Sequence, residues 1–255
     1  MKILVVTGTG TGVGKTIAAA ALAACAIGAG RRVAVVKPIQ TGVAGGEPGD
    51  LSEVARLTGI VDLHECCRYP EPLAPATAAR RIGERGPTVG ELADQVRALA
   101  DRDLVIIEGA GGAMVRFNSA AETLVDLIAD LDREWGVQTI LVASSGLGVL
   151  NIAALTRRAF AERGLHLRHL VVGDWPAEPD LADRCNLADL PDYAGAAIRG
   201  LIPAGAGRLD RVAFTSLAPS WLAPPLDGCL DVADFVARNG APAPTRSAPF
   251  RTGAR

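Results

Sequence analysis

The stretch KILVVTGTGTGVGKT, residues 2–16, decides the fold of this chain. Its apolar first half leads directly into a glycine-rich turn ending in Lys15 and Thr16, and an alanine-rich segment of helical period follows at once. A strand, a glycine loop and a helix in this order predict a phosphate-binding loop, because inward-pointing N–H groups and the helix N-terminus attract phosphate oxygens. The match to G-x-x-x-x-G-K-[ST] departs at its first glycine, where Thr9 stands, so a glycine-rich turn without a ligand is the alternative.

We expect the loop to bind a nucleoside triphosphate. Its lysine would reach the outer phosphates, and its threonine hydroxyl would ligate Mg²⁺. The expected contacts along the loop are Gly12, Val13, Gly14, Lys15, Thr16 and Ile17.

Short runs rich in Val and Ile alternate with Ala/Leu/Arg segments of helical period along the whole chain. This alternation is typical of repeated βαβ units and predicts an α/β fold: a doubly wound, mainly parallel sheet with helices on both faces, of the P-loop NTPase type. The clearest strands are expected at 2–7, 33–37, 104–108, 139–143 and 167–173, and the clearest helices at 15–29, 51–58, 90–100, 123–134, 151–163, 179–190 and 231–238. We expect residues 1–239 to form a single domain and the Pro/Ala/Gly/Arg-rich residues 240–255 to be a disordered tail.

Composition excludes several classes of partner. The 255 residues carry a net charge of −2, which predicts neither a nucleic-acid surface nor a basic membrane patch. The longest apolar stretch, residues 17–29, is too short to span a bilayer. The five cysteines follow no metal-ligand or disulfide pattern, so a cytoplasmic protein with small-molecule partners is expected.

The second strand ends in Lys37, within the segment KPIQTG at residues 37–42. Of the 26 basic residues only Lys2, Lys15 and Lys37 are lysines, so a lysine here indicates a need for a compact ammonium group. A buried cation without a partner costs several kcal/mol, so Lys37 is expected to face a protein carboxylate or a bound anion. The alternative is a strand-end lysine that extends to solvent.

Two acidic residues are candidate magnesium ligands. Glu108 ends an apolar strand and leads into glycines, which is the placement of an acidic ligand opposite the phosphate loop, although a loop cap is the alternative. Asp50 follows a glycine-rich loop that can carry it toward the metal, but the run Asp50 to Glu53 also has the pattern of a helix N-cap with its reciprocal Glu.

Three segments together resemble the dethiobiotin synthetase family: GTGTGVGKT at residues 8–16, KPIQTG at residues 37–42 and EGAGG at residues 108–112. The resemblance extends over residues 1 to about 239, and the KPxxTG element is its most specific part. It implies a ligase of biotin biosynthesis that uses Mg²⁺, ATP, CO₂ and 7,8-diaminopelargonic acid, and that closes a cyclic urea through a carbamate and a carbamic-phosphoric anhydride.

The resemblance also implies roles for individual residues. Lys37 and Lys15 would be catalytic, Thr11 and Thr41 would contact the substrate, and the metal ligands would be Thr16, Asp50 and Glu108. Further nucleotide contacts would come from Gly109, Ala110 and Gly111. The family implies a homodimer in which the substrate carboxylate meets a helix N-terminus of the other subunit, and the matching residues are Leu147, Gly148 and Asn151.

Two departures from the family pattern concern specificity. Some members carry acidic residues where this chain has Gly10 and Gly12, and many members read adenine with an asparagine where this chain has Gly173 and Asp174. We therefore expect CTP or other triphosphates to be possible alternatives to ATP. The nucleotide base would be contacted only by backbone groups, those of Gly173, Asp174, Pro203, Ala204 and Gly205.

Three other functions share the phosphate loop. A switch ATPase of the partitioning type carries a signature lysine early in the loop, where this chain has Gly10. A cobyrinate-type amide ligase needs a glutaminase domain for which the chain has no room. A nucleotide-binding module without catalysis would be expected to lose Lys15 or Glu108, and both are present.

Overall fold

The computed structural model describes residues 1–242 and contains a central sheet of seven strands in the order β4-β2-β6-β1-β7-β8-β9. Every pairing between these strands is parallel. A separate two-stranded sheet pairs β3 (Gln40–Thr41) with β5 (Arg68–Tyr69). The strands of the large sheet are β1 (Lys2–Gly8), β2 (Val33–Lys37), β4 (Leu63–Glu65), β6 (Leu104–Gly112), β7 (Gln138–Ala143), β8 (His169–Trp175) and β9 (Ile198–Pro203).

The predicted α/β fold is confirmed, but several strands differ from the expectation. β6 continues past Glu108 to Gly112, so the acidic residue lies inside the strand rather than at its end. β8 begins and ends two residues later than expected, which places Asp174 inside it. The edge strands β4 and β9 were not predicted, because one has three residues and the other is interrupted by Arg199 and Gly200.

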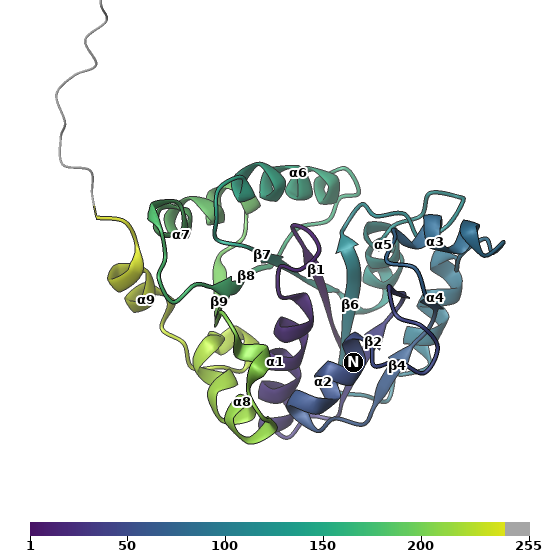
Figure 1. The fold of residues 1–255 in the computed structure, drawn as a ribbon, viewed down its shortest axis with the longest axis horizontal. Coiled ribbons are helices and arrows are strands. Elements are labelled where there is room, and N and C mark those ends of the chain that lie inside the picture. The colour runs from purple at the N-terminus through teal and green to yellow at the C-terminus, as the bar shows by residue number, and fades with distance from the viewer. Residues whose placement is uncertain (243–255) are drawn as a thin grey trace, which may run out of the picture.

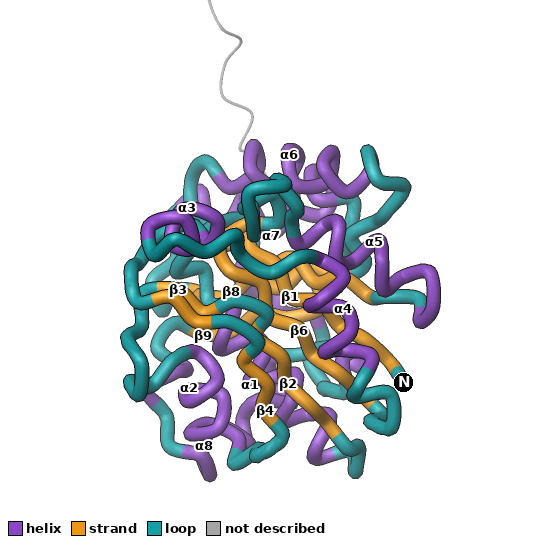
Figure 2. The backbone as a smooth tube through the Cα atoms, turned by 90° about the vertical axis from the view of Figure 1, so that its right-hand side faces the viewer, coloured by secondary structure: helices purple, strands orange, loops and turns teal. Residues whose placement is uncertain are grey.

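Helices cover both faces of the sheet (Figures 1 and 2). One face packs against the first two helices and the helix that follows β9, and the other face packs against the helices between β5 and β9 and against the last described helix. The helices are α1 (Lys15–Gly28), α2 (Asp50–Thr58), α3 (Pro75–Arg81), α4 (Val89–Arg97), α5 (Leu124–Trp135), α6 (Val149–Ala161), α7 (Leu181–Ala194), α8 (Arg211–Leu217) and α9 (Val232–Asn239). The strands are therefore nearly continuous in hydrophobicity, as burial on both sides requires.

Helix α1 lies directly behind the phosphate loop and is buried along most of its length. Its small alanine side chains allow it to approach the sheet closely, while Leu22 and Cys25 fill the remaining space. Within the described residues the first turn of α1 contains no acidic side chain and the N-cap glycine makes no side-chain cap. The first N–H groups of this helix are thus available to an anion.

The interpretation of Asp50 as a helix N-cap is wrong. Gly49 is the N-cap of α2, and Asp50 is the first helical residue. Glu53 does not return to the N-cap but pairs with Arg56. The side chain of Asp50 is therefore left to interact outside its own helix.

The predicted tail, residues 240–255, lies from residue 243 onward outside the described residues. The helix expected at 231–238 is present as α9, shifted by one residue. A single domain over 1–239 stays a prediction. No helix within residues 1–242 combines the length and the apolar character that a membrane span requires.

Candidate functional site

The phosphate loop connects β1 to α1 at the carboxyl edge of the sheet, and its backbone requires glycine at Gly14. This residue has a φ of 89°, and a Cβ atom there would lie 2.4 Å from the carbonyl oxygen of Gly173. The converse holds at Gly173, where a Cβ atom would lie 2.1 Å from the carbonyl oxygen of Val13. The loop and β8 therefore approach each other more closely than any side chain allows.

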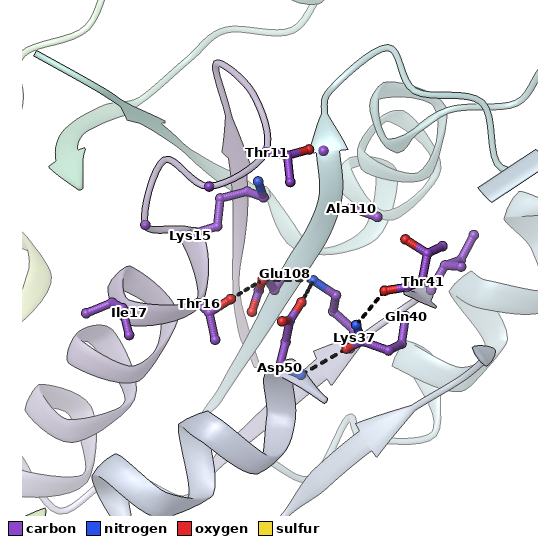
Figure 3. Close-up of a pocket in the computed structure, with 14 residues that line it drawn as sticks. Thr11, Lys15, Thr16, Ile17, Lys37, Gln40, Thr41, Asp50, Glu108 and Ala110 are labelled. Atoms are coloured by element: carbon purple, nitrogen blue, oxygen red, sulfur yellow. Dashed lines mark hydrogen bonds and ion pairs between the residues drawn. The ribbon is translucent and has the colours of Figure 1, made fainter. Parts of the chain in front are cut away.

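A cavity of about 380 Å³ opens beside this loop (Figure 3). It lies over the carboxyl ends of β1, β2 and β6, where ligands bind in doubly wound sheets. Its lining residues are Thr11, Gly12, Gly14, Lys15, Thr16, Ile17, Lys37, Ile39, Gln40, Thr41, Asp50, Glu108, Ala110 and Gly111. The predicted loop, lysine, acidic and threonine residues thus meet in one place, although they come from segments up to about a hundred residues apart.

Lys37 is the centre of a charged network in this cavity. Its Nζ lies 2.8 Å from Oε1 of Glu108 and 2.5 Å from Oδ2 of Asp50. Lys37 and Glu108 are buried, with 3% and 1% of their side-chain surfaces exposed. The expectation that Lys37 faces a partner rather than solvent is confirmed, and the partners are two carboxylates.

These contacts decide the protonation of Lys37. Burial acts to lower its pKa, but the charges of Glu108 and Asp50 outweigh burial and raise the pKa above the usual lysine value. Lys37 therefore holds its proton and stays an ammonium group. Burial raises the pKa of the Glu108 carboxyl, and the Lys37 ammonium acts against that rise.

Lys15 lies across the cavity from this network and is oriented by its own loop. Its Nζ donates to the carbonyl oxygen of Gly10 at 2.7 Å. Burial lowers the pKa of Lys15, and the nearby charge of Lys37 lowers it further, while Glu108 and Asp50 act in the opposite direction. Two ammonium groups thus belong to one cavity, which suits a ligand that carries several negative charges.

The oxygen atoms around Glu108 fit a magnesium ion. Thr16 donates its hydroxyl proton to Oε1 of Glu108 at 2.8 Å, and Lys37 donates to the same oxygen. Oε2 of Glu108 is buried and has no hydrogen-bond partner within the described residues. With the carboxylate of Asp50 this makes a hard, all-oxygen donor set, and Mg²⁺ is commonly held by one or two carboxylates together with waters and substrate phosphates.

Gln40 was not predicted as a site residue, yet it sets the position of Asp50. Its side-chain Oε1 accepts the backbone N–H of Asp50 at 2.9 Å, and its Nε2 donates to the carbonyl oxygen of Thr41. Gln40 is 4% exposed and lines the cavity, as does Ile39. The only available signal for both residues was their position inside the segment KPIQTG.

A second cavity of about 190 Å³ adjoins the first and shares Gly12, Gly14 and Ile17 with it. Its outer wall contains Gly173, Asp174, Pro203, Gly205, Ala206 and Gly207. Ala206 and Gly207 were not predicted. Ala204 does not line the cavity, and its N–H donates to the carbonyl oxygen of Trp175.

Leu147, Gly148 and Asn151 line neither cavity. They lie at the start of α6 and are exposed, Leu147 to 95%. Gly109 and Val13 also lie outside the walls of the larger cavity, although the carbonyl oxygen of Gly109 is 3.5 Å from Nζ of Lys37. Their roles as contacts stay predictions.

The parallel sheet and the phosphate loop define a P-loop nucleotide-binding protein. A family model described as "AAA domain" matches residues 2–206. The chain is similar over its length to the MinC:MinD cell division protein complex of Aquifex aeolicus, with a TM-score of 0.54 and coverage of 96% of this chain and 99% of that chain. The identity is 12%, so this likeness shows the fold alone.

Comparison with curated sequences narrows the class. The chain is 53% identical to the ATP-dependent dethiobiotin synthetase BioD of Streptomyces coelicolor, over 94% of this chain and 100% of the relative. It is 54% identical to the protein of the same name from Frankia casuarinae, over 93% of this chain and 99% of the relative. The chain belongs to the dethiobiotin synthetase family, whose members are ligases that form carbon–nitrogen bonds.

Proposed function

We propose that this enzyme closes the ureido ring of dethiobiotin from 7,8-diaminopelargonic acid and CO₂, with a nucleoside triphosphate and Mg²⁺. The observation that supports this most directly is the ammonium group of Lys37, which lies within 2.8 Å of both Asp50 and Glu108 in the cavity that also contains Lys15. A ligase of this kind must bring a carbamate and a triphosphate together, and both are anions. Fixed positive charge at their meeting point is the main means of catalysing phosphoryl transfer.

In the first step one amine of the substrate attacks CO₂, a C–N bond forms, and a proton leaves to give a carbamate. Thr41, near Lys37, and Thr11, in the phosphate loop near Lys15, both line the cavity and would orient the diamine through their hydroxyl groups. Lys37 would bind the carbamate oxygens, because its ammonium group is buried and keeps its proton.

In the second step a carbamate oxygen attacks the γ-phosphorus, and the bond from that phosphorus to the bridging oxygen breaks. Lys15 would bind the phosphoryl oxygens as charge moves onto the departing nucleoside diphosphate, and the N–H groups at the start of α1 would bind the remaining phosphates. Thr16, Asp50 and Glu108 would hold Mg²⁺, which when bound neutralises the triphosphate and aligns it.

In the third step the second amine attacks the carbonyl carbon of the carbamic-phosphoric anhydride. The C–O bond to phosphate breaks, a proton leaves the nitrogen, and the five-membered urea ring closes. Lys37 would stabilise the negative charge that develops on the carbonyl oxygen and on the departing phosphate. One ammonium group would thus assist at three successive anionic centres.

The smaller cavity would hold the nucleotide base. ATP is the co-substrate named for the relatives, and in this chain the wall of the cavity is formed mainly by glycine, proline and alanine. Among the residues of this wall Asp174 alone has a polar side chain. A wall with so few side-chain partners for adenine gives weak discrimination, so CTP and other triphosphates are proposed as alternatives to ATP.

The exposed start of α6 would serve a second copy of the chain. In a cytoplasmic homodimer Leu147, Gly148 and Asn151 of one subunit would bind the substrate carboxylate in the other. Gly148 caps α6 without a side chain, and the first turn of the helix contains no acidic residue. These features suit a carboxylate, because free N–H groups and the helix dipole both favour an anion.

Phosphate release from the purified protein tests the proposal. Mg²⁺, bicarbonate and each of several nucleoside triphosphates are supplied with and without diaminopelargonate, and the product is identified by mass spectrometry. We expect release to depend on the diamine and to match dethiobiotin formation one for one. Release that ignores the diamine would instead favour a switch ATPase of the partitioning type.

A further inference from the structure

A buried polar cluster lies beside the start of α6, where the substrate carboxylate is proposed to bind, and it belongs to neither cavity. It joins the loop after β7 to the first two turns of α7 through Ser145, Asp183 and Asn186. The three side chains are 4%, 8% and 6% exposed. Burying a polar side chain costs free energy unless it has hydrogen-bond partners, so three such side chains together indicate a role for their contacts.

Asn186 holds two consecutive carbonyl groups of the loop. Its Nδ2 donates to the carbonyl oxygen of Ser145 at 2.6 Å and to that of Gly146 at 3.1 Å. The carbonyl oxygen of Gly146 also accepts from the N–H of Val149, at 3.4 Å, at the start of α6. The loop is therefore fixed to α7 immediately before the residues proposed to bind the carboxylate.

The orientation of these carbonyl groups determines where the next N–H groups point. In a planar trans peptide, the C=O of one residue and the N–H of the next point in opposite directions. The carbonyl groups of Ser145 and Gly146 point at Asn186, so the N–H groups of Gly146 and Leu147 point away from α7. Neither N–H finds an acceptor within residues 1–242.

Asp183 holds the same loop by a third contact. Its Oδ1 accepts the hydroxyl proton of Ser145 at 2.6 Å, and its Oδ2 accepts the backbone N–H of Asp180 at 2.9 Å. No cation pairs with Asp183 among the described residues. Asp183 lies in the first turn of α7, so the positive end of the helix dipole stabilises its carboxylate instead.

We propose that Asn186 and Asp183 are positioning residues for the substrate carboxylate. By holding Ser145 and Gly146 they aim the N–H groups of Gly146 and Leu147, together with the start of α6, at one anionic group. The inference rests on the proposed function, because the anion is the carboxylate of the diamine substrate. It adds α7 to the elements that determine substrate affinity, although no residue of α7 lines either cavity.

Asn186→Ala tests this role with two substrates. One is 7,8-diaminopelargonate and the other is 2,3-diaminononane, in which a methyl group replaces the carboxylate. Without the two hydrogen bonds from the Asn186 amide we expect the KM for diaminopelargonate to rise about tenfold, with kcat changed less than twofold. The KM for 2,3-diaminononane should stay within twofold, because that substrate has no group for the loop to bind.

Thr139→Val is the matched control. Thr139 is buried at the other end of β7 and donates a hydrogen bond of the same length, 2.6 Å, to the carbonyl oxygen of His166. Its loss should lower the melting temperature without changing either KM. Ser145→Ala, which removes only one of the three contacts, is the milder second variant and should raise the KM for diaminopelargonate about threefold.

The outcomes distinguish a failure of the positioning role from a failure of the proposed function. An equal rise in KM for both substrates, or a rise in neither, would overturn the positioning role while leaving the proposed function intact. A wild-type enzyme that turns over both diamines with the same KM would overturn the carboxylate site itself, and the positioning role with it. A wild-type enzyme that turns over neither diamine would overturn the proposed function.

Discussion

The two cavities at the carboxyl edge of the sheet are built in opposite ways. The larger one, between β1, β2 and β6, is organised by buried charged side chains: Lys37 and Glu108, with Asp50 at their side. The smaller one, beside β8 and β9, is organised by backbone contact, with Gly14 and Gly173 pressed together and glycine and alanine forming much of the wall.

In the proposed function, the larger cavity carries out the reaction and the smaller one binds the nucleotide base, and their construction suits these two roles. Charges held in a buried network cannot move without a large cost in free energy, so the geometry of the larger cavity is fixed. A wall made mainly of backbone offers shape but few specific partners, and the proposal that the smaller cavity accepts more than one base rests on this property. The first three predictions below each act on one of the two cavities and leave the other as the reference. The fourth concerns His169, which lines neither cavity.

Lys37→Gln should have the largest effect. Ring closure should fall on the order of 10³-fold, because an ammonium group is lost from every anionic step, while the nucleotide Kd should change by less than about threefold. The measurements are single-turnover product formation and nucleotide binding. Glu108 also loses its buried partner, so the melting temperature should fall.

Lys2→Gln is the control for that variant, because Lys2 lies at the amino end of β1, away from the cavity. It should keep the activity of the wild type. Equal activity in Lys37→Gln would remove Lys37 from the mechanism.

Gly173→Ala should have the next largest effect, and it should act on binding. The new Cβ would lie 2.1 Å from the carbonyl oxygen of Val13 and 2.5 Å from Cγ1 of Val142, so the phosphate loop must shift. We expect the nucleotide KM to rise about thirtyfold, and phosphate release at saturating nucleotide to fall much less. Gly90→Ala, in open space on α4, is the control and should be slightly stabilising.

Arg56→Ala should have a smaller effect, again in the smaller cavity. Arg56 extends from α2 and donates to the carbonyl oxygens of Gly207, in the wall of the smaller cavity, and of Leu209, just after it in the chain. Losing these contacts should raise the nucleotide KM about threefold and change the ratio of CTP to ATP use. Arg133→Ala removes a longer and more exposed i,i+3 ion pair, on α5, and should change neither quantity.

The smallest effect concerns the pH dependence of stability. Burial lowers the pKa of His169, at the start of β8, to about 4, and the charges of Lys2, Arg199 and Arg168 contribute. Between pH 6.5 and 4 the unfolded chain therefore binds a proton that the folded chain does not, so stability falls as pH falls through this window. We expect a loss of about 1–2 kcal/mol.

Chemical denaturation at pH 7 and pH 4.5 measures that loss. His169→Gln should show a correspondingly smaller difference between the two pH values. An unchanged difference in the variant would assign the acid sensitivity to other groups.

The strand and loop segments could be predicted from sequence because their signals are local. An apolar run before a glycine loop has one structural interpretation, and Lys37 stands at the end of such a run. The convergence of Lys15, Lys37 and Glu108 follows from the same reasoning, since parallel strands present their carboxyl ends at one edge. The exact end of β6 was missed because glycine rarely continues a strand.

Local signals were not enough for Asp50. Its sequence fits both an N-cap and a metal ligand, and the structure excludes the N-cap, which is Gly49. The oxygen of the Gln40 side chain accepts a hydrogen bond from the backbone N–H of Asp50, and the Asp50 carboxylate faces Lys37. Metal ligation by Asp50 stays a proposal. Likewise no local pattern around residue 145 predicts its contact with Asn186, some forty positions away.

The sequence by itself determined the order of most of the long strands and helices, the phosphate loop and the residues at the strand ends, because hydrophobic period and glycine placement act over a few residues. The tertiary structure alone decided which carboxylate meets which ammonium group, which glycine touches which carbonyl oxygen, and which helix holds the loop before α6. Those contacts depend on packing between segments that are distant in the chain, and no local pattern encodes the distance between them.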